Sequence, residues 1–309
     1  MRKETFILCL TCLLLLLSGC QAKTEPTPVI SPTTLIPEET NIPTATSTPT
    51  KYNTPTSSPT VITPTQPALS LTDLEDTLID GVDWYFQVES SDGTILLSRN
   101  FEESFHPASM IKVPTAMVVL KILENEGKTL ADIQSYGISG RNFADLLEAM
   151  IVRSEESATD ALEFYARGDN RLRKTLDQWG LTETTYDPRR SSVKDLMTSL
   201  RLLDSSDALS AEYQRFLLDL MGRYTEYDAI LLGKLLVNLP NCQFLNKRGT
   251  LLNPTIASDM GILRCGEQSW YLVVAGTPAA SSTRTFENIQ ASIEAFALAF
   301  GKFIQLQGE

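Results

Sequence analysis

The stretch that decides the fold runs from residue 105 to residue 118 and reads FHPASMIKVPTAMV. It opens a mostly apolar run that extends to Asn125, which is long enough for a buried helix. Ser109 and Lys112 are three residues apart, so on a helix they share one face and lie within reach of each other. Desolvation of Lys112 among apolar neighbours would lower its pKa and let the amine accept a proton. This pattern predicts a serine nucleophile that is activated by a lysine base.

The same spacing of serine and lysine occurs a second time, at Ser191 and Lys194. This copy follows Pro188-Arg189-Arg190 and opens an amphipathic helix, so we interpret it as a helix cap with an exposed lysine. The alternative interpretation of Ser109 is similar: the serine would cap a helix, and Lys112 would extend along apolar surface to bring its amine to solvent. His106 is a second candidate base, although a lone histidine beside Phe105 and Pro107 more often packs or lies at the surface.

Segments on both sides of this helix predict a sheet that is built from the two ends of the chain. Upstream, residues 84–98 indicate two strands around a turn at Ser91–Gly93. Downstream, helical periodicity recurs over 143–152, 158–166, 172–179, 193–203, 213–221 and 228–239. The chain then indicates strands over 243–251, 257–264 and 270–276, and a last amphipathic helix over 288–304. We expect an α/β (α+β) fold with a five-stranded antiparallel sheet flanked by helices, plus an all-helical subdomain.

Two cysteines lie symmetrically about Asn253-Pro254, the expected turn between two of these strands. Cys242 and Cys265 would therefore face each other across a regular hairpin, close enough to form a disulfide. The alternative is a pair of buried free thiols.

The first residues have the pattern of a secretory signal. Met1-Arg2-Lys3 is basic and residues 6–17 are mostly apolar. This apolar run is shorter than the roughly 20 residues that a transmembrane helix needs. The sequence Leu17-Ser18-Gly19-Cys20 resembles a bacterial lipobox, which implies cleavage before Cys20 and attachment of lipid to its sulfur. An ordinary signal peptide or an anchor helix with an incidental cysteine is the alternative. We expect an extracytoplasmic protein that is lipid-anchored to the bacterial cell membrane.

A low-complexity tract follows the lipobox. Of the 16 prolines in the chain, 10 lie between Gln21 and Ser70, and 29 of those 50 residues are proline, serine or threonine. Such a tract cannot bury a core and indicates an extended spacer rather than a binding segment. The predicted organisation is a signal peptide (1–19), a lipidated Cys20 with a disordered linker (20–70), and one folded domain (71–309).

Composition excludes several classes of function. A net charge of −12 argues against nucleic acid as a partner. With a single histidine, and with its CxxC pair Cys9 and Cys12 inside the predicted signal peptide, the expected folded domain lacks the usual ligand sets of transition metals. It also has no phosphate-binding glycine loop. We expect a monomer that uses no cofactor and no metal.

Three motifs in order make the chain resemble the serine β-lactamases and penicillin-binding proteins, and class A β-lactamases in particular. The family's motifs are S-x-x-K, S-D-N and K-T-G. Here they correspond to Ser109-Met110-Ile111-Lys112, Ser154-Glu155-Glu156 and Lys247-Arg248-Gly249-Thr250. The first falls on the buried helix, the second follows a helix, and the third falls on a strand, as in the family. The resemblance covers roughly residues 83–303.

The resemblance implies a role for each matching residue. Ser109 would be acylated, Lys112 would take or relay its proton, and Ser154 would pass a proton to the leaving nitrogen. Lys247 would hold the substrate carboxylate, with Arg248, Gly249, Thr250 and Glu156 beside the substrate. The backbone N–H groups of Ser109 and Thr250 would form the oxyanion hole.

Three departures separate the chain from the family pattern. Glu156 stands where the family has asparagine, and Arg248 stands where it has threonine or serine. The deacylating glutamate of class A enzymes also has no counterpart in a recognisable motif over 179–188, although Glu183 and Asp187 lie there.

The expected function is hydrolysis of β-lactams through an acyl-enzyme on Ser109. The alternatives are a D-alanyl-D-alanine carboxypeptidase acting on peptidoglycan stem peptides, and a non-catalytic lipoprotein that binds cell-wall peptides.

Overall fold

A computed structural model of the chain describes residues 70–224 and 231–307. The predicted signal peptide, Cys20 and nearly all of the predicted linker lie outside the described residues. The first half of the described chain contains α1 (Leu71–Glu75), β1 (Val82–Ser90), β2 (Ile95–Arg99), η1 (Ala108–Ile111), α2 (Lys112–Asn125), α3 (Leu130–Ile133), β3 (Gly137–Ile138), β4 (Arg141–Asn142), α4 (Phe143–Ile151), α5 (Glu156–Arg167), η2 (Gly168–Asn170) and α6 (Arg171–Gln178). The second half contains β5 (Thr185–Tyr186), β6 (Arg189–Arg190), α7 (Val193–Asp204), α8 (Ala211–Tyr224), η3 (Leu231–Val237), β7 (Gln243–Leu252), β8 (Thr255–Cys265), β9 (Gln268–Pro278) and α9 (Phe286–Gln307).

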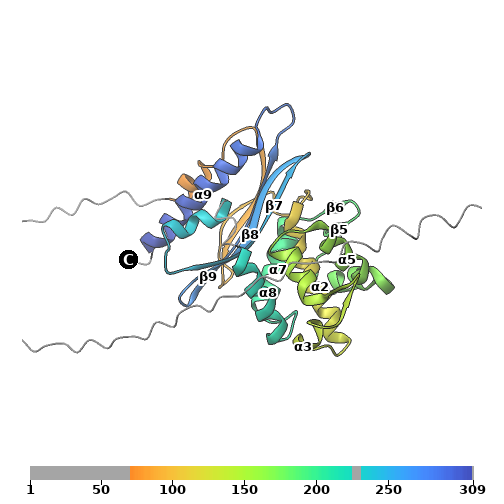
Figure 1. The fold of residues 1–309 in the computed structure, drawn as a ribbon. Helices are drawn as coiled ribbons and strands as arrows, with labels where there is room; N and C mark the ends of the chain where they lie inside the picture. The colour runs from red at the N-terminus through yellow and green to blue at the C-terminus, as the bar shows by residue number, and fades with distance from the viewer. Residues whose placement is uncertain (1–69, 225–230, 308–309) are drawn as a thin grey trace, which may run out of the picture. The chain divides into compact units, whose positions relative to one another are not determined.

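Five long strands form one antiparallel sheet with the order β2-β1-β9-β8-β7. The N-terminal hairpin pairs with the last strand, so the two ends of the domain meet in the sheet (Figure 1). This arrangement confirms the predicted five-stranded antiparallel sheet. Strand β7 is an edge strand of this sheet, and its free edge lies against η1.

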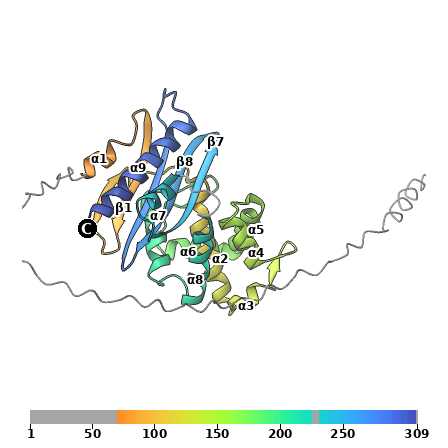
Figure 2. The ribbon, with the colours of Figure 1, turned by 60° about the vertical axis from the view of Figure 1, so that its left-hand side comes forward.

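Helices cover both faces of the sheet (Figures 1 and 2). On one face, α9 and η3 pack over side chains such as Trp84, Phe86 and Phe296. On the other face lies the helical block from α2 to α8, whose core includes Met117, Leu147 and other fully buried side chains. Because eight consecutive residues of β8, 256–263, are buried, both faces of this interior strand are covered.

The helices of the block begin where polar side chains cap them. Asn142 accepts a hydrogen bond from the N–H of Asp145 at the start of α4, and Ser192 does the same for Asp195 at the start of α7. The predicted helices over 143–152, 158–166, 172–179, 193–203, 213–221 and 288–304 correspond to α4 to α9 within a few residues at each end. The segment predicted over 228–239 contains the 3₁₀ helix η3 instead of an α-helix.

Hairpin β7–β8 has the register that the sequence symmetry predicts. Leu252 faces Thr255 across the turn at Asn253-Pro254, and Gln243 faces Arg264 at the other end. Cys242 and Cys265 follow in this register and are joined by a disulfide with an S–S distance of 1.98 Å. The disulfide links the open ends of the two strands.

No helix in the described ranges is both long enough and apolar enough to cross a membrane.

Candidate active site

The nucleophile candidate lies in a tight turn just before α2. Ser109 belongs to the 3₁₀ turn η1, and Lys112 is the first residue of α2. Ala108 has a φ of 49°, a conformation that residues with a Cβ rarely adopt. The N–H of Ala108 donates to His106 Nδ1 at 3.0 Å, which helps to hold the turn. The turn leaves Ser109 half-buried, whereas Met110 and Ile111 are fully buried.

Ser154 stands between Ser109 and Lys112. Its hydroxyl donates to Ser109 Oγ at 3.1 Å, and Lys112 Nζ donates to the same hydroxyl at 3.1 Å and to the Ser154 carbonyl at 2.8 Å. Ser154 has a φ of 56°, so the loop between α4 and α5 turns its carbonyl and its hydroxyl toward the same amine. Ser109 and Lys112 are thus connected through a hydroxyl that can both donate and accept.

Glu156 is the third acceptor around Lys112. Its Oε1 lies 2.6 Å from Nζ, and the lysine side chain is fully buried while the glutamate side chain is 55% exposed. An ammonium group has three protons. The two oxygens of Ser154 and the carboxylate of Glu156 supply three acceptors, so the resting site accommodates Lys112 as an ammonium ion.

Arg189 of β6 holds the other side of the Glu156 carboxylate. Arg189 Nη1 lies 2.9 Å from Glu156 Oε2, and Nη2 lies 3.3 Å from Glu163 Oε1. Glu163 lies two turns further along α5 and is only 5% exposed. The guanidinium therefore bridges Glu156 and Glu163 of α5 and lies 3.8 Å from a third carboxylate there, Asp160, while Glu156 also contacts Lys112.

Burial and ion pairing act against each other on this network. Burial lowers the pKa of Lys112 below its ordinary value, and the hydrogen bond and charge of Glu156 oppose this shift. Burial raises the pKa of Glu156, but hydrogen bonds from Lys112 and Arg189 outweigh burial, and the pKa of Glu156 lies below its ordinary value. Burial also raises the pKa of Glu163. Glu156 is thus a fixed negative charge at neutral pH.

The third motif reaches the nucleophile from the edge of the sheet. Gly249 of β7 packs so closely on η1 that a Cβ there would lie 2.9 Å from the Ser109 nitrogen and 2.8 Å from the Pro107 carbonyl oxygen. Only glycine permits this approach. Thr250 follows Gly249 on the same free edge. The backbone of 249–250 thus borders Ser109, where donors to a developing oxyanion are needed.

Lys247 is a second buried amine in the site. Its side chain is fully buried, and burial together with repulsion from Lys112 lowers its pKa to about 7. Arg248 alternates to the other face of β7 and is directly opposite Asp259 on β8. Burial raises the pKa of Asp259 to about 7 against the hydrogen bond from Asn246. Lys247 rather than Arg248 therefore shares the sheet face of Gly249.

Several candidates lie away from this cluster. His106 contacts the backbone of its own turn and lines a cavity of about 210 Å³ with Tyr85, Phe105 and Arg190. Of the second Ser–Lys pair, Lys194 is exposed and pairs with Glu102 at 2.8 Å. The helix cap is Ser192 rather than Ser191, because Ser191 is buried in a hydrogen bond with Thr184.

The two loop carboxylates also differ from the cluster in their surroundings. Glu183 is exposed, its backbone N–H donates to Asp195, and its charge acts on Lys194 and Asp195. Asp187 is exposed beside Pro188. Among the described residues, the carboxylate in direct contact with Lys112 is that of Glu156.

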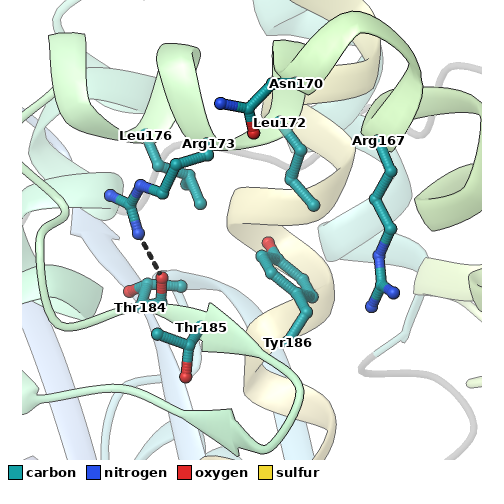
Figure 3. A pocket seen from close by; sticks show the side chains of 8 residues that line it. All are labelled: Arg167, Asn170, Leu172, Arg173, Leu176, Thr184, Thr185 and Tyr186. Atoms are coloured by element: carbon teal, nitrogen blue, oxygen red, sulfur yellow. Dashed lines mark hydrogen bonds between the residues drawn. The ribbon is translucent and has the colours of Figure 1, made fainter.

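A separate cavity of about 200 Å³ lies between α6 and β5, with Arg167 and Arg173 on two sides of it (Figure 3). Arg173 donates to the carbonyl of Thr184 at 2.9 Å. The hydroxyl of Tyr186 accepts from Thr115, one turn beyond Lys112 on α2. Tyr186, which lines this cavity, thus links it to α2.

Sequence patterns did not predict the part played by Arg189 and Glu163. Arg189 follows a short loop and Glu163 lies inside an amphipathic helix, so neither position has a local signal of function. Their meeting with Glu156 depends on how β6 packs against α5.

Comparisons with known proteins identify the family and the fold. A model of the β-lactamase enzyme family matches residues 80–297. Among curated proteins, a sequence search finds no match. A mutant of PBP-A, solved as an acyl-enzyme complex with penicillin G, is 20% identical and has a TM-score of 0.60 over 77% of this chain and 99% of that chain.

Two β-lactamase structures have the same fold. An ancestral class A β-lactamase is 20% identical, with a TM-score of 0.61 over 75% of this chain and 97% of that chain. A β-lactamase from Sphaerobacter thermophilus is 14% identical, with a TM-score of 0.64 over 77% and 98% of the two chains. Together with the family model, which covers most of the described residues, these likenesses lead to one assignment. The chain belongs to the β-lactamase enzyme family.

Proposed function

We propose that the protein is a serine hydrolase that opens β-lactams by forming an acyl-enzyme on Ser109. The observation that carries this proposal is the hydrogen-bonded chain from Ser109 Oγ through Ser154 Oγ to the fully buried Lys112. A serine hydroxyl is a weak nucleophile until a neighbouring base accepts its proton, and a desolvated amine is such a base. The family assignment and the motif order support the same reaction.

In the proposed acylation, Ser109 Oγ attacks the lactam carbonyl carbon, and its proton passes to the amine of Lys112 directly or through Ser154. The carbon–nitrogen bond of the ring then breaks, and Ser154 transfers a proton to the leaving nitrogen while Lys112 returns its proton to Ser154. Because a hydroxyl can donate and accept at once, Ser154 serves both transfers without moving away from Lys112. The product is an ester between Ser109 and the opened ring.

The edge of the sheet provides the proposed binding groups. The N–H groups of Ser109 and Thr250 would stabilise the oxyanion, a contribution of about 3 kcal/mol per donor in enzymes of this kind. Lys247, with Gly249 beside it, would attract the carboxylate of the substrate. Arg248 lies on the opposite strand face beside Asp259, so we assign it an indirect electrostatic effect on the substrate carboxylate.

Release of the acyl group by water distinguishes a β-lactamase from a penicillin-binding protein. Glu183 and Asp187 are exposed, and Glu183 faces Lys194 and Asp195. This observation favours a second candidate, an enzyme that is acylated readily and deacylated slowly. Such an enzyme would suit D-alanyl peptides of the cell wall as well as β-lactams.

We also propose that the protein acts outside the cytoplasm while anchored to the cell membrane by lipid on Cys20. The basic start, the short apolar run and the lipobox support this proposal. The tract over 20–70 would hold the domain away from the membrane.

The test is incubation of the chain with a fluorescent penicillin, followed by intact-mass analysis over time. We expect the wild type to gain the mass of one penicillin and Ser109→Ala to gain none. Ser191→Ala is the matched control, because it removes the serine of the second Ser–Lys pair, and it should be labelled like the wild type.

The time course separates the candidates. Rapid loss of the adduct with appearance of the ring-opened product means a β-lactamase, and a persistent adduct means acylation without turnover. Failure of the wild type to react under conditions that label a known penicillin-binding protein would refute acyl-enzyme formation and leave a non-catalytic binding protein.

A further inference from the structure

One carboxylate, Glu156, is shared by two cations in the site. Its Oε1 lies 2.6 Å from Lys112 Nζ and its Oε2 lies 2.9 Å from Arg189 Nη1. Each oxygen therefore has its own cation, and the carboxylate is fixed at both ends. We propose that Arg189 is a positioning residue that acts through Glu156, and that the two residues together set how readily Lys112 releases its proton.

The argument begins with the donors of Lys112. In the resting site its amine has Ser154 O, Ser154 Oγ and Glu156 Oε1 as acceptors. Three acceptors, one of them a carboxylate, favour the ammonium form of Lys112, and only the neutral form can accept the proton of Ser109. Glu156 thus stabilises the ammonium form of Lys112, which is inactive as a base. An uncharged side chain at this position would not stabilise that form.

Arg189 acts in the opposite sense. Its guanidinium shares the charge of Glu156 and also repels the ammonium form of Lys112. It can do both because Glu163 anchors its second nitrogen at 3.3 Å from a nearly buried position on α5. Arg189 is therefore held in place independently of Lys112. By pairing with Glu156, it weakens the electrostatic attraction between that carboxylate and the Lys112 amine.

The charged groups around Lys112 come from three elements. Glu156 and Glu163 face it from α5 and favour the ammonium form, whereas Arg189 of β6 and Lys247 of β7 disfavour it. Tyr186 of β5 lies one turn away through its hydrogen bond with Thr115. In Figure 1, β5 and β6 lie beside α5 at the end of the helical block, so Arg189 enters this cluster from a separate segment.

The two substitutions are expected to move the titration of Lys112 in opposite directions. Glu156→Gln removes the paired charge, so the amine should titrate about one pH unit lower or more. Arg189→Gln removes a repelling cation while the 2.6 Å pair remains, so the amine should titrate at higher pH. Loss of fold would move both variants in the same direction, toward the ordinary value of lysine.

The experiment is a pH titration of the Lys112 Cε resonance by ¹³C NMR, using full-length protein with labelled lysine. Lys112→Arg identifies the resonance by its disappearance. Arg189→Lys keeps a cation and should retain most of the wild-type midpoint. Arg190→Gln is the matched control, because Arg190 belongs to the same two-residue strand but donates to the Ser104 carbonyl at 2.7 Å, and it should leave the midpoint unchanged.

The proposal is overturned if Glu156→Gln leaves the Lys112 midpoint unchanged, or if Arg189→Gln lowers it as Glu156→Gln does. The inference that Glu156 and Arg189 affect catalysis rests on the proposed function, but the titration itself needs no substrate. The pH profile of penicillin acylation is measured in the same variants and is expected to follow the NMR midpoints. Absence of acylation in the wild type, with the NMR shifts as expected, would refute the proposed function and leave this inference in place.

Discussion

Two buried amines dominate the electrostatics around Ser109. Lys112 and Lys247 are both fully buried, and each lowers the tendency of the other to carry a charge. Lys112 has Glu156 to balance it, whereas the pKa of Lys247 falls to about 7. At neutral pH Lys247 is thus only partly charged, so its attraction for an anion changes with pH, whereas Lys112 keeps its ion pair with Glu156.

The pKa of Lys247 predicts how binding of an anionic substrate changes with pH. Because this pKa is lowered, Lys247 is charged below about pH 7 and loses its charge as the pH rises through that value. We expect the acylation rate constant of a penicillin, divided by that of its methyl ester, to fall about tenfold between pH 6 and pH 8. Any effect of Lys112 cancels in this ratio. A ratio that stays constant with pH would contradict the role of Lys247.

At the scale of elements, the site depends on contact between strand β7 and turn η1. The strand supplies an edge without a neighbouring strand, and η1 places Ser109 against it. The helical block supplies the remaining groups, Ser154 before α5 and Glu156 at its first residue. Two structural layers therefore meet at the nucleophile, so small shifts between them change its geometry.

Gly249→Ala tests this contact. The added Cβ would lie within 3 Å of backbone atoms of Pro107 and Ser109, so β7 and η1 must move apart. We expect the acylation rate to fall at least about 100-fold, because a displacement of about 1 Å has that effect in enzymes. Circular dichroism should show a retained fold. Gly233→Ala is the control, since a Cβ there meets nothing within 4 Å, and equal loss in both variants would argue against the role of the contact.

The disulfide stabilises the hairpin from which β7 and β8 are built. Cys242 and Cys265 are 23 positions apart, so the bond closes a loop that would otherwise add entropy to the unfolded chain. We expect reduction, or Cys242→Ser with Cys265→Ser, to lower the free energy of unfolding by about 3 kcal/mol. Urea unfolding with and without reductant measures the difference. Identical curves, with two reactive thiols in the denatured unreduced protein, would show that the bond does not form.

At the scale of the whole molecule, the chain has a predicted tether of about 50 residues ahead of the hydrolase domain. The folded domain carries the described elements, and the sequence before Ser70 carries the predicted signals for export and anchoring. Such an arrangement would keep the enzyme near the cell wall without embedding the domain in lipid.

Cys20→Ser tests the anchor. Without its sulfur the chain has no site for the lipid, so we expect it to lose incorporation of labelled palmitate in a bacterial host and to leave the membrane fraction. Cys12→Ser, a change of the same kind inside the predicted signal peptide, should retain both. Palmitate incorporation that survives Cys20→Ser would refute lipidation at that cysteine.

Much of this fold followed from local patterns. Alternation in the strands, helical periodicity, and turns at Ser91–Gly93 and Asn253-Pro254 predicted the main elements within a few residues. The short hairpins β3–β4 and β5–β6 escaped prediction because two-residue strands have no period to detect. Ser109 was expected on the helix but lies in the preceding 3₁₀ turn, because Ala108 adopts a positive φ that residue type does not reveal.

The sequence by itself determined the family, the order of the three motifs and the choice of Ser109, Lys112, Ser154 and Lys247 as candidate site residues, because these depend on residue type and spacing along the chain. Tertiary structure alone decided the partners of those residues. Ser154 came between Ser109 and Lys112, and Glu156 became shared with Arg189. Ion pairs and burial depend on segments that are distant in the chain, so the charge of a buried amine is a property of the packed molecule.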